Sequence, residues 1–124
     1  MDACPVRRRR RDGRRWILES ELLWSIAART LTLGTDVILD YGCWSEEERE
    51  LFRTRAKHLA ASTQLVLLDP PFEVLWNRLE RRNENLPPAT FPIKQSELRE
   101  YQARFELPTT DELHRWDHHV VIND

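Results

Sequence analysis

Apolar residues recur at helical spacing in four stretches of this chain. The spacing predicts helices over about residues 17–33, 45–61, 70–82 and 96–105. The boundaries carry their own signals, because a glycine follows the first helix, a capping box opens the second and two prolines open the third. The capping box, Ser45-Glu46-Glu47-Glu48, also places acidic residues in the first turn, where the helix dipole favours them.

Three shorter, unbroken apolar runs predict β-strands. They span residues 36–40, 64–69 and 119–123. Apolar runs without alternation are typical of strands buried on both faces, and strands separated by helices form parallel sheets through right-handed crossovers. The sequence therefore predicts an α/β fold, a three-layer parallel sheet with helices on both sides. The segment 106–117 is polar and is predicted to be irregular.

Length and charge indicate a basic tail followed by one domain. The 124 residues suffice for one modest domain. Residues 1–15 lack apolar periodicity and are rich in arginine, so we expect a disordered basic tail there and the folded domain at 16–124.

The cysteines and the apolar runs bear on the location of the protein. Cys4 and Cys43 fit neither a disulfide scaffold nor a metal-binding spacing, so they favour a reducing compartment. No apolar run is long enough to cross a membrane, and Glu19 and Glu21 interrupt the stretch that would have to be uncharged in a signal peptide. We therefore expect a cytoplasmic protein without a membrane partner.

Asp40 ends the first predicted strand. In parallel sheets of this kind, ligands bind beyond the carboxyl ends of the strands. A carboxylate at that position can hold a magnesium ion beside a nucleotide, directly or through water. The alternative is a strand-end residue that accepts hydrogen bonds from turn amides, and the pattern of three apolar residues and an aspartate does not by itself decide between them.

Arg78 and Arg82 lie four residues apart and therefore share one face of a predicted helix. Guanidinium groups bind phosphate oxygens through two parallel hydrogen bonds. The proline-rich stretch that follows cannot be helical, so the arginines could close over a triphosphate from a mobile segment. The alternative is an ordinary solvated helix end, with the arginines paired to Glu80 or Glu84.

Four stretches of the sequence resemble a known family. They are GTDVILDYGCWSEEER at 34–49, LLDPPFEVLWNRLERRN at 67–83, LPPATFPI at 86–93 and FELPTTDEL at 105–113. In this order they resemble bacterial P-loop small-molecule kinases, which are AAA-family ATP-binding proteins similar to chloramphenicol phosphotransferase and the zeta-toxin kinases. The resemblance runs from about Trp16 to the last residue.

The resemblance implies a fold of the nucleoside monophosphate kinase type and a phosphotransferase that uses ATP and Mg²⁺. The acceptor would be a small molecule or a nucleotide. Asp40 would lie near the magnesium ion, Arg78 and Arg82 would clamp the phosphates in catalysis, and Asn83 would contribute to nucleotide binding. Residues 78–95 would form a lid.

One departure from the family is large, because the sequence contains no GxxxxGK[ST] motif. That motif cradles phosphates with backbone amides, and its lysine reaches the β- and γ-oxygens. We therefore expect a fold that lacks the first strand, the phosphate loop and the first helix, and a truncated chain with little or no activity. The sheet faces left uncovered would risk aggregation or need a protein partner.

The sequence is also compatible with two functions other than catalysis. The first is a non-catalytic module that binds a protein partner. The second is nucleic-acid binding through the arginine-rich tail, which the absence of interleaved aromatic residues does not favour. The sequence does not identify the phosphate acceptor.

Overall fold

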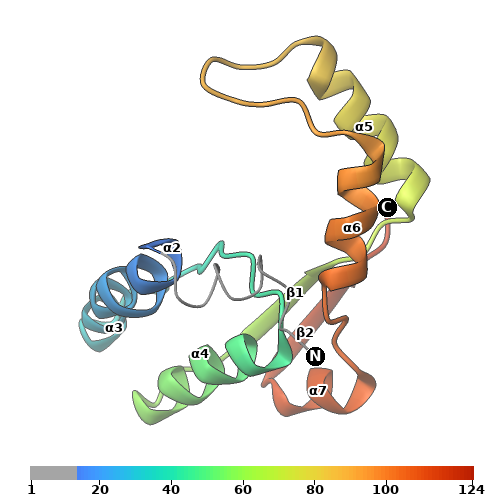
Figure 1. Cartoon of the computed structure of the whole chain (residues 1–124). Helices are drawn as coiled ribbons and strands as arrows, with labels where there is room; N and C mark the ends of the chain where they lie inside the picture. The colour runs from blue at the N-terminus through green and yellow to red at the C-terminus, as the bar shows by residue number, and fades with distance from the viewer. Residues whose placement is uncertain (1–13) are drawn as a thin grey trace, which may run out of the picture. The chain divides into compact units, whose positions relative to one another are not determined.

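The computed structural model describes residues 14–124, which divide into two compact units (Figure 1). The first unit runs to Gly42 and also contains Arg55–Ala61. The second contains Cys43–Thr54 and Ser62–Asp124. Most of the predicted basic tail lies outside the described residues, although Arg14 and Arg15 already belong to a helix.

Helix makes up most of the described part of the first unit, as predicted for residues 17–33. Helix α2 (Arg14–Ile17) continues into the π-helical segment η1 (Leu18–Leu23) and then into α3 (Trp24–Thr32). The π-helical turn is a difference from the prediction, and the hydrophobic pattern gives no sign of it. π-Helical turns are rare and occur mostly as short insertions inside α-helices.

Gly34 ends this helix as predicted. Its φ angle is +87°, a left-handed conformation that glycine adopts without a steric penalty. Its amide donates to the Leu31 carbonyl at 2.9 Å, and the Thr35 amide donates to the Thr30 carbonyl at 3.1 Å. These two bonds satisfy carbonyl groups that the end of a helix leaves unpaired, as in a Schellman motif.

The strand predicted at residues 36–40 does not form in the first unit. These residues have no regular secondary structure, and the side chain of Ile38 is 92% exposed. A β-strand requires a neighbouring strand to pair its backbone amides and carbonyls. No such neighbour pairs with 36–40 in the described part of the chain, so the apolar pattern alone does not produce a strand.

Helix α4 (Glu46–His58) begins at the predicted capping box. The Ser45 hydroxyl accepts from the Glu48 amide at 3.1 Å, and the Glu48 carboxylate accepts from the Trp44 amide at 3.0 Å. Farther along the helix, Arg55 belongs to the first unit, where it donates to the Ser20 carbonyl at 2.7 Å. The sequence therefore located both the start and the type of this element.

The second unit contains a parallel pair of strands, β1 (Gln64–Leu68) and β2 (His118–Ile122), which lie side by side in Figure 1. Their register pairs Gln64 with His118 and Leu68 with Ile122. The predicted parallel orientation is confirmed, and the fold is α/β. Within the described residues the sheet has two strands, so the three-layer arrangement stays a prediction.

Three helices complete the second unit. Helices α5 (Phe72–Glu84) and α6 (Gln95–Arg104) occupy the predicted places. Helix α7 (Thr110–Arg115) corrects the prediction that 106–117 is irregular. Its first turn is capped by the Thr109 hydroxyl, which accepts from the Glu112 amide at 3.2 Å. None of the described helices is long and apolar enough to span a membrane.

Candidate functional site: an arginine face beside a clamped loop

The candidate arginines lie on the last turns of α5, next to the loop 85–94, which we call the lid loop (Figure 1). Arg78 and Arg82 are both exposed. Arg82 donates through Nη2 to the carbonyl of Phe91 in the lid loop at 3.2 Å. Arg78 makes no hydrogen bond or ion pair with any residue that the structure describes, so its guanidinium donors are available to a ligand. The alternative of pairing with Glu80 or Glu84 is not seen there.

Asn83 closes the lid loop. Its Nδ2 donates to the Ile93 carbonyl at 2.8 Å, and its Oδ1 accepts from the Ile93 amide at 3.2 Å. Both functional atoms of the side chain are therefore used within the protein. In this arrangement Asn83 shapes the loop, and its predicted role in nucleotide binding would require the clamp to open.

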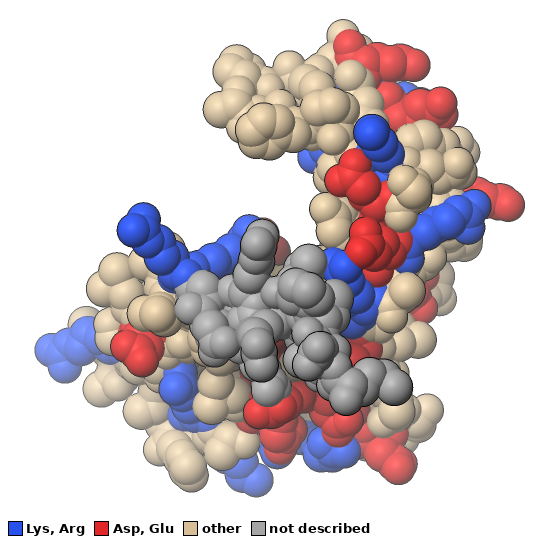
Figure 2. Space-filling model, viewed as in Figure 1, with Lys and Arg blue, Asp and Glu red and all other residues tan. Residues whose placement is uncertain are grey.

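The lid loop carries one charged residue, Lys94 at its end, and projects a large apolar residue. Its tip is the tan surface at the upper left of Figure 2, beyond the mixed red and blue surface of the neighbouring helices. Phe91 is 83% exposed. A turn forms at Pro87, whose carbonyl accepts from the Thr90 hydroxyl at 2.6 Å. The loop is thus a closed, structured element rather than an extended linker.

Asp40, the predicted magnesium ligand, is exposed and belongs to the first unit. Arg78 and Arg82 belong to the second unit, so their joint geometry with Asp40 stays a prediction. Among the described residues, no group of three or more histidine, cysteine or acidic side chains is placed to hold a metal ion. Magnesium is commonly bound by one or two carboxylates together with substrate phosphates, which is compatible with a single aspartate.

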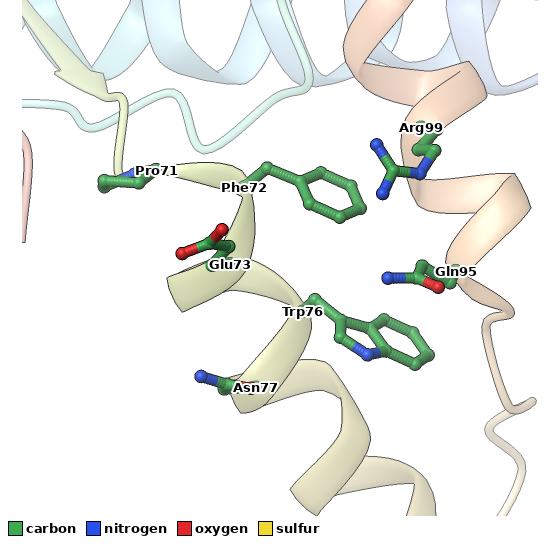
Figure 3. Close-up of a pocket in the computed structure, with 7 residues that line it drawn as sticks. All are labelled: Pro71, Phe72, Glu73, Trp76, Asn77, Gln95 and Arg99. Carbon is green, nitrogen blue, oxygen red and sulfur yellow. The ribbon is translucent and has the colours of Figure 1, made fainter.

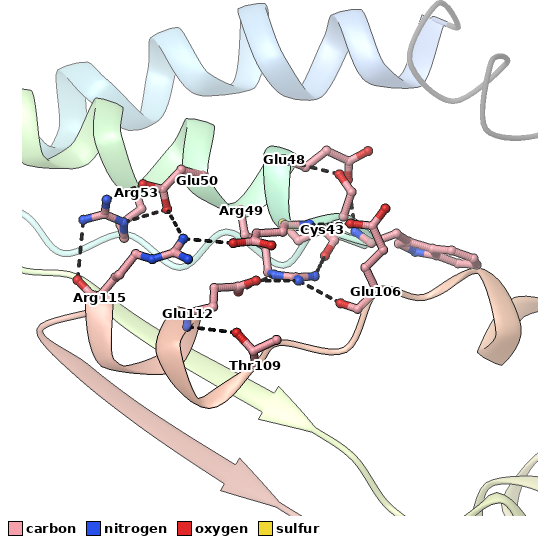
Figure 4. A network of polar contacts seen from close by, with 12 residues as sticks. Cys43, Glu48, Arg49, Glu50, Arg53, Glu106, Thr109, Glu112 and Arg115 are labelled. Atoms are coloured by element: carbon pink, nitrogen blue, oxygen red, sulfur yellow. Dashed lines mark hydrogen bonds and ion pairs between the residues drawn. The ribbon is translucent and has the colours of Figure 1, made fainter. Parts of the chain in front are cut away.

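A buried ion pair that the sequence prediction missed holds the second unit together (Figure 4). Arg49 and Glu112 are 3% and 1% exposed. Nε of Arg49 lies 2.7 Å from Oε2 of Glu112, and Nη2 lies 2.8 Å from Oε1. This bidentate geometry aligns two parallel hydrogen bonds between planar groups, the arrangement in which an arginine–carboxylate pair is strongest.

The remaining donors of Arg49 bind backbone carbonyls. Nη1 donates to Cys43 at 2.9 Å, and Nη2 donates to Glu106 at 2.7 Å. Cys43 has a φ angle of +42°, which is unfavourable for a residue with a side chain, so the bond from Arg49 helps to hold a strained turn. We call Cys43, Arg49, Glu106 and Glu112 the polar junction.

Backbone contacts reinforce the polar junction on the side of α4. The Glu106 amide donates to the Trp44 carbonyl at 2.8 Å, and the Glu106 carboxylate accepts from the Glu46 amide at 3.1 Å. Trp44 also packs edge-on against Tyr101 of α6, with ring centroids 5.8 Å apart. The segment before α4 and the segment before α7 are thereby fixed to each other.

A partly exposed charge cluster lies beside the junction. The hydrogen bond from Arg53, followed by the nearby charges of Arg53 and Arg115, lowers the pKa of Glu50, although partial burial opposes the shift. The same hydrogen bond raises the pKa of Arg53. The pair lies three residues apart on α4 and is partly exposed to solvent, so its contribution to stability is small, about 0.2–0.5 kcal/mol.

The sequence held partial signals for the residues that were missed. Thr109 and Glu112 stand in the S/T-x-x-E spacing of a capping box, which would have located α7. Arg49 and Glu112 both lie inside stretches quoted for the family resemblance. Their pairing had no local signal, because 63 positions separate them in the chain.

Comparison with known proteins identifies the family. A family model described as an AAA domain matches residues 5–108. The match covers most of the chain, so the protein belongs to this P-loop kinase-like family. The family implies nucleotide binding of the kinase-like P-loop type, generally of ATP with Mg²⁺, and small-molecule or nucleotide substrates. No curated protein matches the chain.

Proposed function

We propose that this protein contributes the phosphate-binding arginines of an ATP-dependent phosphotransferase, which acts on a small molecule or a nucleotide. The observation that carries the proposal is the guanidinium of Arg78, which has no hydrogen bond or ion pair within residues 14–124. It stands one helical turn from Arg82 and beside the clamped lid loop, in a chain of a P-loop kinase-like family. Exposed arginines without carboxylate partners are suited to phosphate oxygens.

The residues present fit ATP only in part. Arg78 and Arg82 would hold its phosphates, and the exposed carboxylate of Asp40 would hold Mg²⁺. ATP would supply the phosphoryl group when bound. Asn83 fits a loop-shaping role better than that of a ligand, because Ile93 occupies both of its polar atoms.

The sequence lacks the GxxxxGK[ST] motif, whose backbone amides and lysine stabilise the transferring phosphoryl group in this class. We therefore expect this chain alone to bind nucleotide weakly and to transfer phosphoryl groups at close to the uncatalysed rate. In the complete three-layer fold, residues 36–40 would enter the parallel sheet as a further strand.

Calorimetric titration with Mg-ATP tests the nucleotide site. We expect weak but saturable binding, and the variant Arg78→Ala/Arg82→Ala should weaken it at least tenfold. The matched control is Arg104→Ala, because Arg104 lies on neighbouring α6 and pairs with Glu100. Absence of binding by the folded chain, or equal affinity in the double variant and the control, would remove the proposed role of the arginines.

A second candidate function is supported by the sheet. Val66 and Leu68 of β1 are 52% and 68% exposed, and Val120 and Val121 of β2 are also exposed. Parallel sheets are almost always covered on both faces, so these strands fit a non-catalytic module that binds a protein partner. Sedimentation should then show association that Val66→Lys/Val120→Lys abolishes; a monomer at high concentration would count against this function.

The third possibility, nucleic-acid binding through the arginine tail, falls on residues that lie mostly outside the described part of the chain. Deletion of 1–15 should abolish salt-sensitive binding to a DNA or RNA duplex if the tail is responsible. Unchanged binding after the deletion would remove this function.

A further inference from the structure

A pocket lies between α5 and α6, within the second unit, and the candidate phosphate arginines do not line it. It has a volume of about 600 Å³. That size falls within the range of small-molecule sites, which are commonly 300–1,000 Å³. Its lining residues come from the first two turns of α5, the residue before them, and the first two turns of α6: Pro71, Phe72, Glu73, Trp76, Asn77, Gln95 and Arg99.

Four of these side chains face one another across the pocket (Figure 3). Phe72 and Trp76 project from α5 toward α6, and Gln95 and Arg99 project from α6 toward α5. Each pair is spaced four residues apart, so each lies on one helix face. Glu73 and Asn77 point to the other side of α5 in this view. The α5 side of the pocket thus carries two aromatic rings, and the α6 side carries one amide and one guanidinium.

Phe72 orients the guanidinium of Arg99. The Cζ atom of Arg99 lies 4.2 Å from the centroid of the Phe72 ring, which is a close cation–π contact. Arg99 makes no ion pair or hydrogen bond with the residues that the structure describes. A guanidinium held by its face keeps its in-plane N–H donors for an anion, which a lysine at this position would not achieve.

Trp76 and Gln95 offer complementary chemistry beside that anion site. The indole of Trp76 is half-buried, and a planar ring can stack on it. The amide of Gln95 carries both donors and an acceptor, so it can hydrogen-bond the edge of a nucleobase. The pocket therefore offers a group for each part of a nucleoside monophosphate. The indole can stack on the base, the amide can hydrogen-bond the edge of the base, and the guanidinium can bind the phosphate.

We propose that the pocket between α5 and α6 binds a nucleoside monophosphate, with the base on Trp76 and Gln95 and the phosphate on Arg99. The further statement that this nucleoside monophosphate is the phosphate acceptor rests on the proposed function. The binding of the nucleotide in the pocket does not depend on that function. The site requires neither Arg78 nor Arg82.

The test is calorimetric titration of the full chain with AMP, adenosine and inorganic phosphate. AMP should bind more tightly than adenosine, and phosphate alone should not saturate. Arg99→Ala should reduce AMP to the affinity of adenosine, and Trp76→Ala should weaken both ligands about tenfold, as the loss of one base stack does. Trp76→Phe retains a ring and should restore most of the affinity, which separates loss of stacking from loss of folding.

Two controls separate this site from the ATP site. Arg104→Ala, on the same helix as Arg99, should leave AMP binding unchanged. Arg78→Ala/Arg82→Ala should weaken Mg-ATP and leave AMP unchanged. AMP binding without Mg-ATP binding would support the pocket and count against the proposed function. No AMP binding, AMP binding unaffected by Trp76→Ala and Arg99→Ala, or AMP binding that depends on Arg78 and Arg82 would overturn the inference.

Discussion

The polar junction and the β1–β2 sheet belong to the same unit but differ in what they bury. The junction buries charged side chains, whereas the sheet leaves apolar side chains exposed. In the junction, Arg49 and Glu112 carry charges that are costly to bury, yet both are almost fully covered. Arg49 donates four hydrogen bonds to Glu112 and two carbonyls. In the sheet, apolar side chains that water disfavours remain exposed, and only Leu67 of β1 is buried.

The difference shows which part of the unit is complete within the described residues. A buried ion pair requires its partners to be present, because an unpaired charge in the interior costs several kcal/mol, of order 3–5. An exposed apolar strand costs less free energy than an unpaired buried charge. It can therefore persist without a layer that covers it. The polar junction therefore has all the partners that its buried charges require. The sheet would gain stability from further strands or helices that cover its exposed apolar side chains.

The largest test of this contrast is Glu112→Ala. It leaves the guanidinium of Arg49 buried without its carboxylate, so we expect a loss of about 3–5 kcal/mol in the free energy of unfolding. Urea denaturation followed by circular dichroism measures it. The control is Asp111→Ala, an exposed neighbour in the first turn of α7, which should cost less than about 1 kcal/mol. Equal losses in the two variants would show that the pair is not the element that holds the junction.

The sheet should respond less to truncation of its most buried residue. Leu67→Ala removes a side chain that is 7% exposed, and we expect a loss of about 2–3 kcal/mol, at the low end for buried leucines, because the surroundings are only partly covered. The adjacent Val66→Ala, on an exposed position, should cost below about 1 kcal/mol. If Leu67→Ala exceeded Glu112→Ala, the sheet rather than the junction would be the stable centre of the unit.

Removal of the Asn83 side chain, which clamps the lid loop, should change the dynamics of that loop alone. Asn83→Ala removes both hydrogen bonds to Ile93, each worth about 0.5–1.5 kcal/mol, so we expect faster amide hydrogen exchange across residues 85–94 with little change in global unfolding. Asn85→Ala, two residues along and exposed, is the matched control. Unchanged exchange in Asn83→Ala would mean that the prolines alone hold the loop.

The smallest effect concerns pH. Because the pKa of Glu50 is lower in the folded chain, the stability it contributes is fully present above the ordinary glutamate pKa of about 4.3 and is lost as the pH falls through the lower folded value. We expect the difference in stability between the natural chain and Glu50→Gln to shrink from about 0.5 kcal/mol at pH 7 toward zero in acid. A difference that grows on acidification would contradict the assigned sign.

Local signals in the sequence predicted the elements well where the relevant contacts are close in the chain. Gly34 ends the first helix and Ser45 caps α4, through bonds that span at most five residues. The arginine face before the lid loop was also predictable, because Arg78 and Arg82 lie one turn apart on the same helix. The availability of Arg78 and the clamp at Asn83 were not, since they depend on where the loop returns.

The sequence by itself determined the helices other than α7, the parallel pair of strands and the family, because these follow from apolar spacing and from motifs read in order. Tertiary structure alone decided that Arg49 meets Glu112 and that residues 36–40 do not form a strand. A helix satisfies its backbone within each turn, so its own sequence is sufficient. A strand and a buried ion pair are satisfied only by partners from elsewhere in the chain, so their outcome depends on which partners the fold brings to them.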